Sequence, residues 1–240
     1  MDVDAPFVPV RGIIFDKDGT LFDFSTTWEA WAAAFLRRAA KGDEGLAERA
    51  GAAIGFDLLR GRFERDSVVI AGTPVEIAAD LGPHFPELSQ DVLLVLLNQE
   101  AARAPQAEAV PLAPLLTALR ARGLALGVAT NDAEAPARAH LADAHVDAFF
   151  DFIAGSDSGF GGKPTPGQLL GFCAQTGLPR DSVVMVGDST HDLLAGRAAG
   201  MRTIAVLTGL APREVLAPLA DAVLPDIGGL PAWLDRAVPA

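Results

Sequence analysis

The stretch Gly12-Ile13-Ile14-Phe15-Asp16-Lys17-Asp18-Gly19-Thr20 decides the fold class of this chain. A short apolar run that stops abruptly at Asp and Gly is typical of a buried β-strand that leads into a loop. The next run of this kind, Leu124–Ala129, comes much later in the sequence. The two runs therefore predict buried strands separated by a long insertion.

Beyond Leu124 the sequence alternates regularly between helical and strand-like stretches. We predict helices near 133–144, 166–176 and 189–199, and strands near 149–153, 182–187 and 202–207. An earlier helix begins after Pro111 and ends at Gly123, as expected from the preference for Pro at helix starts and Gly at helix ends. Alternating strands and helices imply parallel pairing with right-handed crossovers. The expected fold is α/β, with a doubly wound parallel sheet that the first strand joins.

The segment 24–104 has a different character. Trp28–Leu36 is rich in helix-forming residues, and helical stretches follow near 44–54, 74–81 and 89–103. The β-like run Val68–Ile70 is too short to anchor a sheet. We therefore expect a mostly helical domain, here called the insert (24–104), within an α/β core made of residues 1–23 and 105–240.

Composition excludes several classes of protein. The 19 Lys+Arg and 31 Asp+Glu residues give a net charge of −12, which lacks the basic footprint of a nucleic-acid binder and attracts an anionic membrane weakly. The single cysteine, Cys173, cannot form an internal disulfide and favours a reducing compartment. The acidic start Met1–Asp4 is unlike a secretory signal, and no apolar run approaches the roughly 18 residues of a membrane span. We expect a cytoplasmic protein without nucleic-acid or membrane partners, and the composition leaves its oligomeric state open.

Polar residues follow the predicted strands directly, at the sheet edge where open α/β proteins bind their ligands. Four separate stretches contribute to this edge, with Lys163 in the loop after the third strand. The set comprises Asp16, Asp18, Thr130, Asn131, Lys163, Asp188 and Asp192.

These residue types point to phosphoryl chemistry. When two carboxyl groups share a site, as Asp16 and Asp18 would, ionisation of one disfavours ionisation of the other. The ionised group then suits a nucleophile or metal ligand, and the protonated group suits a general acid. Carboxylate oxygens favour magnesium, with Asp188 as a third ligand. An ammonium group, a hydroxyl and the N–H groups at helix starts bind an anion.

Two of these residues also have purely structural readings. Thr130 could cap the following helix. Asp192 could simply stabilise the start of its own helix, because a carboxylate interacts favourably with the positive end of the helix dipole.

The motifs resemble those of the haloacid dehalogenase superfamily of phosphohydrolases. They occur in the family's order, as Asp16–Asp23, Val128–Asn131, Lys163-Pro164 and Gly187–Asp192, and the resemblance spans residues 12–207. A helical insert between the first two motifs is similar to the subgroup that includes phosphoglycolate phosphatases and sugar-phosphate mutases.

The resemblance implies a role for each matching residue. Asp16 would attack phosphorus and form an aspartyl-phosphate, while Asp18 would protonate the leaving oxygen and then activate water. Magnesium would be held by Asp16, Asp188 and the backbone carbonyl of Asp18, with Asp192 in support. The phosphoryl oxygens would be bound by Gly19, Thr130, Asn131 and Lys163.

Lys17 departs from the family pattern, which usually has an apolar residue at this position. We expect its side chain to point away from the phosphoryl group, where it could contact the insert or a substrate tail. Within the insert, Trp28 and the arginines Arg60, Arg62 and Arg65 are candidates for substrate contact. The four histidines show no metal-ligand spacing and are expected to be surface or core residues.

The leading prediction is a magnesium-dependent phosphatase of a small phosphorylated metabolite, such as phosphoglycolate or a sugar phosphate. A phosphotransferase or sugar-phosphate mutase that uses the same intermediate remains open. A non-catalytic binding domain would be expected to lack one of the carboxylates, and Asp16, Asp18 and Asp188 are all present.

Overall fold

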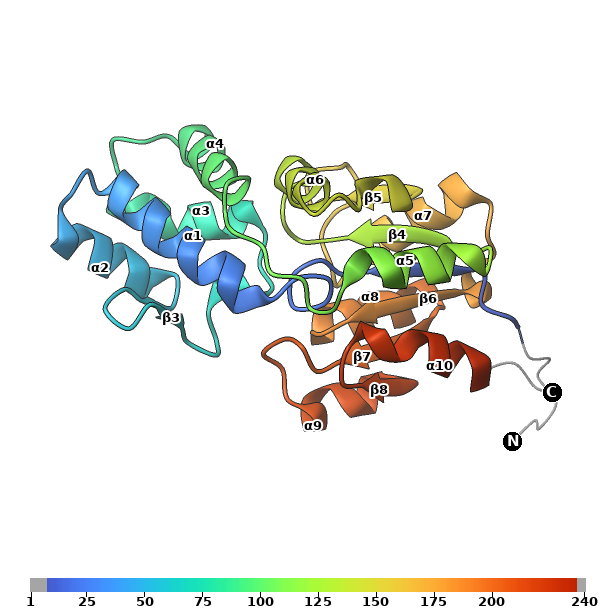
Figure 1. The fold of residues 1–240 in the computed structure, drawn as a ribbon. Coiled ribbons are helices and arrows are strands. Elements are labelled where there is room, and N and C mark those ends of the chain that lie inside the picture. The colour runs from blue at the N-terminus through green and yellow to red at the C-terminus, as the bar shows by residue number, and fades with distance from the viewer. Residues whose placement is uncertain (1–7, 237–240) are drawn as a thin grey trace.

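The computed structural model describes residues 8–236. A parallel sheet with flanking helices forms one lobe, and the helical insert forms a second lobe beyond one end of the sheet (Figure 1). Two connections join the lobes and lie side by side: the N–H of Asp23 donates to the carbonyl of Ala107 (2.8 Å), and that of Ala109 to the carbonyl of Leu21 (2.9 Å). Among the described residues, no helix has the length and apolar character to cross a bilayer.

The sheet confirms the predicted doubly wound parallel fold. Its six strands follow the order β5-β4-β1-β6-β7-β8, and each neighbouring pair is parallel. β1 therefore lies centrally, so the loops after β1, β4 and β6 meet at one edge. The last strand, β8, was not predicted from the sequence. The bounds are β1 (Gly12–Phe15), β4 (Ala125–Ala129), β5 (Phe152–Ala154), β6 (Val183–Gly187), β7 (Arg202–Val206) and β8 (Ala222–Leu224).

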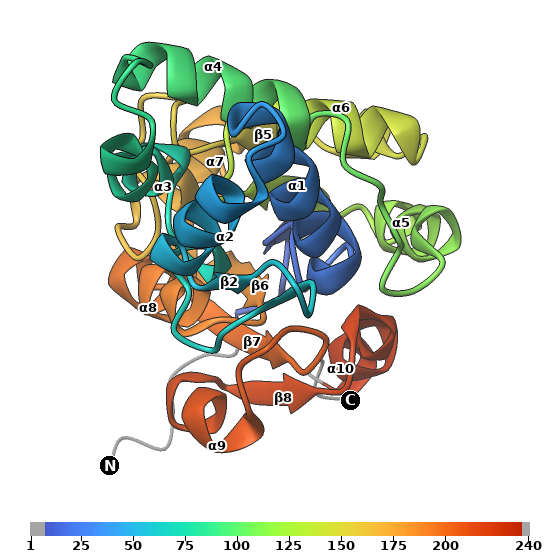
Figure 2. The same ribbon diagram turned by 90° about the vertical axis from the view of Figure 1, so that its left-hand side faces the viewer.

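Helices cover both faces of the sheet. Ile13 and Phe15 of β1 join the apolar cluster beneath α5 and α10, whereas Ile14 joins the cluster beneath α7 and α8. Figure 2 shows these two pairs of helices on opposite sides of the sheet. The core helices are α5 (Leu112–Ala121), α6 (Glu134–Asp143), α7 (Gly167–Thr176), α8 (Thr190–Ala199), α9 (Arg213–Leu216) and α10 (Leu230–Arg236).

The insert has its own apolar core. Trp31, Phe35 and Phe85 are fully buried there, in a cluster separate from those of the sheet. Its helices lie near the predicted positions, but a short antiparallel hairpin was not predicted. The insert contains α1 (Phe24–Ala39), α2 (Glu44–Ala53), β2 (Phe56–Asp57), β3 (Arg62–Phe63), α3 (Pro74–Leu81) and α4 (Gln90–Ala101).

The run Val68–Ile70, which the sequence analysis described as β-like, is a 3₁₀ turn. The hydroxyl of Ser67 accepts from the N–H of Val69 (3.1 Å), and the carbonyl of Val68 accepts from the N–H of Gly72 (2.8 Å). These local bonds close the turn and outweigh the β-propensity of the branched side chains.

Candidate active site

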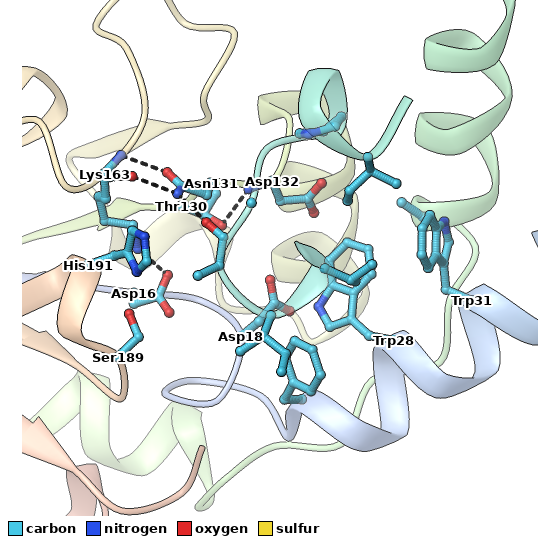
Figure 3. A pocket seen from close by; sticks show the side chains of 18 of the residues that line it. Asp16, Asp18, Trp28, Trp31, Thr130, Asn131, Asp132, Lys163, Ser189 and His191 are labelled. Carbon is cyan, nitrogen blue, oxygen red and sulfur yellow. Dashed lines mark hydrogen bonds and ion pairs between the residues drawn. The ribbon is translucent and has the colours of Figure 1, made fainter. Parts of the chain in front are cut away.

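The ends of three adjacent strands bring the predicted residues together. The N–H of Asp16, directly after β1, donates to the carbonyl of Val186 on β6 (2.9 Å). The N–H of Thr130, directly after β4, donates to the carbonyl of Ala154 on β5 (3.0 Å). The sheet ladder therefore continues into these loops and places their side chains around a single pocket (Figure 3).

Three buried carboxylates form an acidic cluster. The ligand oxygens of Asp16, Asp188 and Asp192 all lie within 4.8 Å of one another. Burial, together with repulsion from Asp192, raises the pKa of Asp16 to about 7. Burial and repulsion from Asp16 likewise raise the pKa of Asp188 well above its ordinary value. Ionisation of the cluster is therefore unfavourable without a cation, and its closely spaced carboxylate oxygens suit a divalent cation.

Lys163 bridges two members of this cluster. Its ammonium nitrogen lies 2.6 Å from Oδ1 of Asp16 and 2.6 Å from Oδ1 of Asp192. Burial opposes its positive charge, but the two carboxylates outweigh burial and raise the pKa of Lys163. Lys163 therefore stays protonated and brings a positive charge to Asp16.

Asp192 is fully engaged by protein donors. Its Oδ1 binds Lys163, and its Oδ2 accepts from the N–H (3.0 Å) and the hydroxyl (2.7 Å) of Ser189. The hydroxyl of Ser189 also caps α8, in a capping box with Asp192. The structure thus gives Asp192 both a helix-capping contact and a place beside the predicted metal site.

Gly19 allows the loop after β1 to approach Asp188 closely. Its φ is +79°, and a Cβ atom there would collide with the carboxylate of Asp188. The hydroxyl of Thr20 donates to Oδ1 of Asp188 (3.2 Å). We expected Gly19 to bind phosphoryl oxygens, but its N–H donates to the carbonyl of Phe22 (2.7 Å) because the loop closes a tight turn. Its observed contribution is the space that it leaves for Asp188.

Asn131 fixes the backbone of Lys163. Its Oδ1 accepts from the N–H of Lys163 (2.7 Å), and its Nδ2 donates to the Lys163 carbonyl (2.9 Å). The same Nδ2 donates to the carbonyl of Ala71 in the insert (2.7 Å). The Asn131 side chain therefore positions Lys163 and ties the insert to the sheet edge.

Lys17 lies at a buried polar junction beside Asp18. Its ammonium nitrogen is 2.7 Å from Oδ1 of Asp18, 3.0 Å from Nδ1 of His140 and 3.5 Å from Oδ2 of Asp132. It also lies 5.6 Å from the ring centroid of Trp28, a cation–π contact with the insert. The contact with the insert was expected, but the pairing with Asp18 was not, because the chain bends at Lys17 instead of continuing as a strand.

The contacts of His140 settle which of its ring nitrogens carries the proton. Nε2 lies 2.7 Å from the carbonyl oxygen of Ala101, which can only accept, so Nε2 donates. Nδ1 is then free to accept from the Lys17 ammonium. Burial and the charge of Lys17 lower the pKa of His140 to about 4. His140 is a neutral core histidine, as expected, and it links Lys17 to the end of α4.

The pocket lies between the acidic cluster and the insert. The cavity has a volume of about 50 Å³. The sheet edge supplies Asp16, Asp18, Thr130, Asn131, Lys163 and Asp188, and the insert supplies mainly apolar side chains. Carboxylates, an ammonium group and a hydroxyl thus face one small enclosed space, which is suited to a phosphoryl group.

Comparison with known proteins agrees with this geometry. The family model described as haloacid dehalogenase-like hydrolase matches residues 10–200. The chain belongs to this family. The phosphoglycolate phosphatase of Yersinia pestis is 30% identical over 246 residues, which cover 97% of this chain and 99% of that protein. The phosphoglycolate phosphatase of Rhodospirillum rubrum is 38% identical over 121 residues, and the match spans about half of each chain.

A solved structure shares the fold of this haloacid dehalogenase-like hydrolase. The crystal structure of a predicted phosphoglycolate phosphatase from Haemophilus somnus 129PT matches with a TM-score of 0.70 and 19% identity, and covers 93% of this chain and 97% of its own. The resemblance drawn from the motifs is therefore confirmed for the family and for the fold.

Of the residues predicted to contact the substrate of this hydrolase, only some line the pocket. Trp28 lines the pocket, whereas Arg60, Arg62 and Arg65 are exposed and do not. Phe63 of β3 packs into the core of the insert, so strand alternation turns Arg62 outward. The arginines therefore do not contact this pocket.

Four further polar residues line the pocket and were not predicted from the sequence: Asn98, Asp132, Ser189 and His191. Asp132 directly follows the Thr130-Asn131 pair and Ser189 follows Asp188, so the rule that selected their neighbours could have found both. The apolar lining of the insert carried no such signal, since its side chains reach the pocket only through tertiary packing.

Proposed function

We propose that this chain is a magnesium-dependent phosphatase that hydrolyses a small phosphomonoester through an aspartyl-phosphate on Asp16. The observation that carries the proposal is the position of Lys163, 2.6 Å from Asp16 at the edge of the acidic cluster. A nucleophilic carboxylate beside a fixed cation suits attack on an anionic ester. The relatives named phosphoglycolate phosphatase support the same reaction class.

The residues present fit a magnesium ion. Asp16 and Asp188 offer buried carboxylate oxygens whose pKa values are raised by burial and by repulsion from neighbouring carboxylates, and the backbone carbonyl of Asp18 would complete the protein ligands. When bound, the ion would neutralise these carboxylates and stabilise charge on the phosphoryl oxygens. Asp192 would support this edge of the site and hold Lys163.

In the first step, the Asp16 carboxylate attacks phosphorus while the bond from phosphorus to the ester oxygen breaks. Asp18 gives its proton to the departing oxygen, so the product leaves as an alcohol. In the second step, the Asp18 carboxylate takes a proton from water as the water oxygen attacks phosphorus. The bond from phosphorus to Asp16 breaks, which releases inorganic phosphate and restores both carboxyl groups.

Lys163 and Thr130 would stabilise the phosphoryl oxygens during both steps. An ammonium group has three N–H donors; Asp16 and Asp192 engage two of those of Lys163, which leaves one for the substrate. With a net charge of −12, the whole protein does not steer anions towards the site, so attraction must be local. We propose that the insert acts as a cap that excludes bulk water.

The test is hydrolysis of 4-nitrophenyl phosphate and of a panel of phosphorylated metabolites, with magnesium and with a chelator. We expect magnesium-dependent phosphate release, and a loss of about 10³-fold or more in kcat in Asp16→Asn, since the nucleophile is removed. Asp80→Asn, which removes an exposed carboxylate on α3, should keep full activity. Activity in Asp16→Asn equal to that of the parent would contradict the mechanism. Isomer interconversion without phosphate release would instead show a mutase.

A further inference from the structure

The leaving group of the substrate must lie against the insert. The phosphoryl group belongs beside Asp16 and Lys163, so the alcohol part of the ester extends to the opposite wall of the pocket. That wall is formed mainly by apolar side chains that include Phe24, Trp28, Ile70, Ile77 and Leu97, and Asn98 adds an uncharged amide to it. Among the described residues, no Lys or Arg of the insert lines the cavity. A carboxylate on the leaving group would therefore meet no cation from this side.

The backbone of the insert does not replace the missing cation. The N–H groups at the 3₁₀ turn beside the pocket already have partners: that of Ile70 donates to the carbonyl of Ser67, and those of Ala71 and Gly72 donate to the carbonyl of Val68. The indole N–H of Trp31 donates to the carbonyl of Leu97 (3.2 Å). These donors are not available to an anion.

Lys17 is also committed elsewhere. Two of its three N–H donors serve Asp18 and His140, and the third faces Asp132. Its side chain is fully buried. The Lys17 ammonium group therefore neutralises protein carboxylates, and Lys17 is not among the residues that line the pocket.

Asp132 lines the pocket and is ion-paired with Lys17, but one of its two carboxylate oxygens accepts no hydrogen bond from the described residues. Its Oδ1 accepts from the N–H of Ala133 (2.7 Å), whereas its buried Oδ2 has no hydrogen-bond partner within residues 8–236. The 3.5 Å separation from Lys17 is longer than a normal hydrogen bond. Figure 3 shows the carboxylate directed towards the side chains of the insert and away from Asp16. A buried acceptor in this state calls for a donor from a ligand.

We infer that Asp132 selects a leaving group that bears a hydroxyl group and no carboxylate. The hydroxyl would donate to Oδ2 of Asp132, and the methylene groups would pack on Trp28 and Ile77. The substrate is then the phosphomonoester of a small, uncharged, hydroxylated alcohol, since a hydroxy-acid ester would bury a second anion beside Asp132. This inference rests on the proposed phosphatase function and deepens it.

Three esters with the same two-carbon skeleton test the inference: 2-hydroxyethyl phosphate, ethyl phosphate and 2-phosphoglycolate. They differ only in a terminal CH₂OH, CH₃ or carboxylate group. We expect kcat/KM to decrease in that order, with 2-hydroxyethyl phosphate preferred to 2-phosphoglycolate by at least about tenfold, because a site that contains an unpaired polar group rejects substrates that do not satisfy it.

The variant Asp132→Asn links this preference to the residue. We expect this variant to reduce the ratio of kcat/KM for 2-hydroxyethyl phosphate to kcat/KM for 2-phosphoglycolate by about tenfold. The substitution removes the negative charge of the side chain and keeps its shape. Both esters are measured on the same preparation, so partial unfolding cancels from the ratio. Asp80→Asn, which removes an exposed carboxylate of the insert, should leave the ratio unchanged.

Equal or faster hydrolysis of 2-phosphoglycolate by the parent would overturn the inference while leaving the phosphatase function intact. An unchanged ratio in Asp132→Asn would overturn the role of Asp132. If neither these esters nor 4-nitrophenyl phosphate released phosphate with magnesium, the proposed function would fail, and the inference with it.

Discussion

The ammonium nitrogen of Lys17 lies 2.7 Å from Oδ1 of Asp18, and the Lys17 side chain is wholly shielded from solvent. Two acidic groups, one histidine and one tryptophan surround this ammonium group. Lys17, the residue between Asp16 and Asp18, therefore holds the end of the loop in place and contacts the insert.

Replacing Lys17 with methionine should destabilise the protein. The change keeps most of the length of the side chain but leaves the carboxylates of Asp18 and Asp132 without their buried cation, at a cost on the order of 3 kcal/mol in the free energy of unfolding. Urea denaturation measures this change. Arg37→Met removes one partner of an exposed ion pair with Glu44 and should cost less than about 1 kcal/mol. If the two variants lost the same free energy of unfolding, the buried contacts of Lys17 would contribute no more to stability than an exposed ion pair.

Asn131→Ala should impair catalysis indirectly. The Asn131 side chain binds the backbone of Lys163, and the change leaves the Lys163 side chain itself intact. Loss of the two hydrogen bonds to the Lys163 backbone frees the loop, and a displacement of about 1 Å in a positioning residue lowers kcat/KM by about 10²-fold. Thr165→Ala, which removes a hydrogen bond within the same loop, is the matched control. Steady-state kinetics that do not differ between the two variants would exclude this role for Asn131.

Gly19→Ala should damage the metal site more than backbone strain alone explains. A Cβ atom at this position would displace the carboxylate of Asp188. Gly177 has a similar positive φ, +69°, but a Cβ atom there would meet no neighbouring atom within 4 Å. Both variants should lose about 1 kcal/mol of stability from strain. Only Gly19→Ala should weaken magnesium binding, as measured by titration calorimetry, and equal magnesium affinities would contradict the close approach.

Magnesium should stabilise the protein more strongly at higher pH. In the metal-free protein the pKa of Asp16 is raised from 3.8 to about 7, chiefly by burial, so the folded state holds a proton that the unfolded chain loses above about pH 4. The stability contributed by this proton is complete below that pH and is lost as the pH rises towards 7. Magnesium must displace the same proton, so its binding strengthens over this range.

Thermal unfolding with and without magnesium, at about pH 5 and about pH 8, measures this dependence. We expect the increase in Tm caused by magnesium to be larger at the higher pH. In Asp16→Asn, this increase should be small at both pH values. The effect of His140 on stability has the opposite sign, because its lowered pKa disfavours the folded state as the pH falls, but it does not change the increment due to magnesium. If the increase in Tm caused by magnesium did not depend on pH, this would contradict competition between the metal and the Asp16 proton.

Much of the fold and of the acidic cluster could be predicted from the sequence. Asp16, Thr130 and Asp188 each directly follow an apolar strand, and parallel strands place their carboxyl ends at one edge. That local signal was sufficient to bring residues from distant parts of the chain to one site. It was sufficient because strand position is encoded by a short run of neighbouring residues.

The remaining features depend on tertiary packing. Lys17 was expected to face away from the site, but a bend after β1 and a long side chain bring its ammonium group to Asp18. Arg62 was a candidate for substrate contact, yet the packing of Phe63 turns it to solvent. The apolar wall around Trp28 is formed by helices whose mutual packing no local pattern specifies.

The most direct test of the account is to identify the phosphorylated residue during turnover. The enzyme is mixed with magnesium and excess 4-nitrophenyl phosphate, quenched in acid within one turnover, and digested for mass spectrometry. The account predicts one added phosphoryl group on the peptide that contains Asp16, and none in Asp16→Asn. A phosphoryl group on another residue, or an unmodified Asp16 while phosphate is being released, would contradict it.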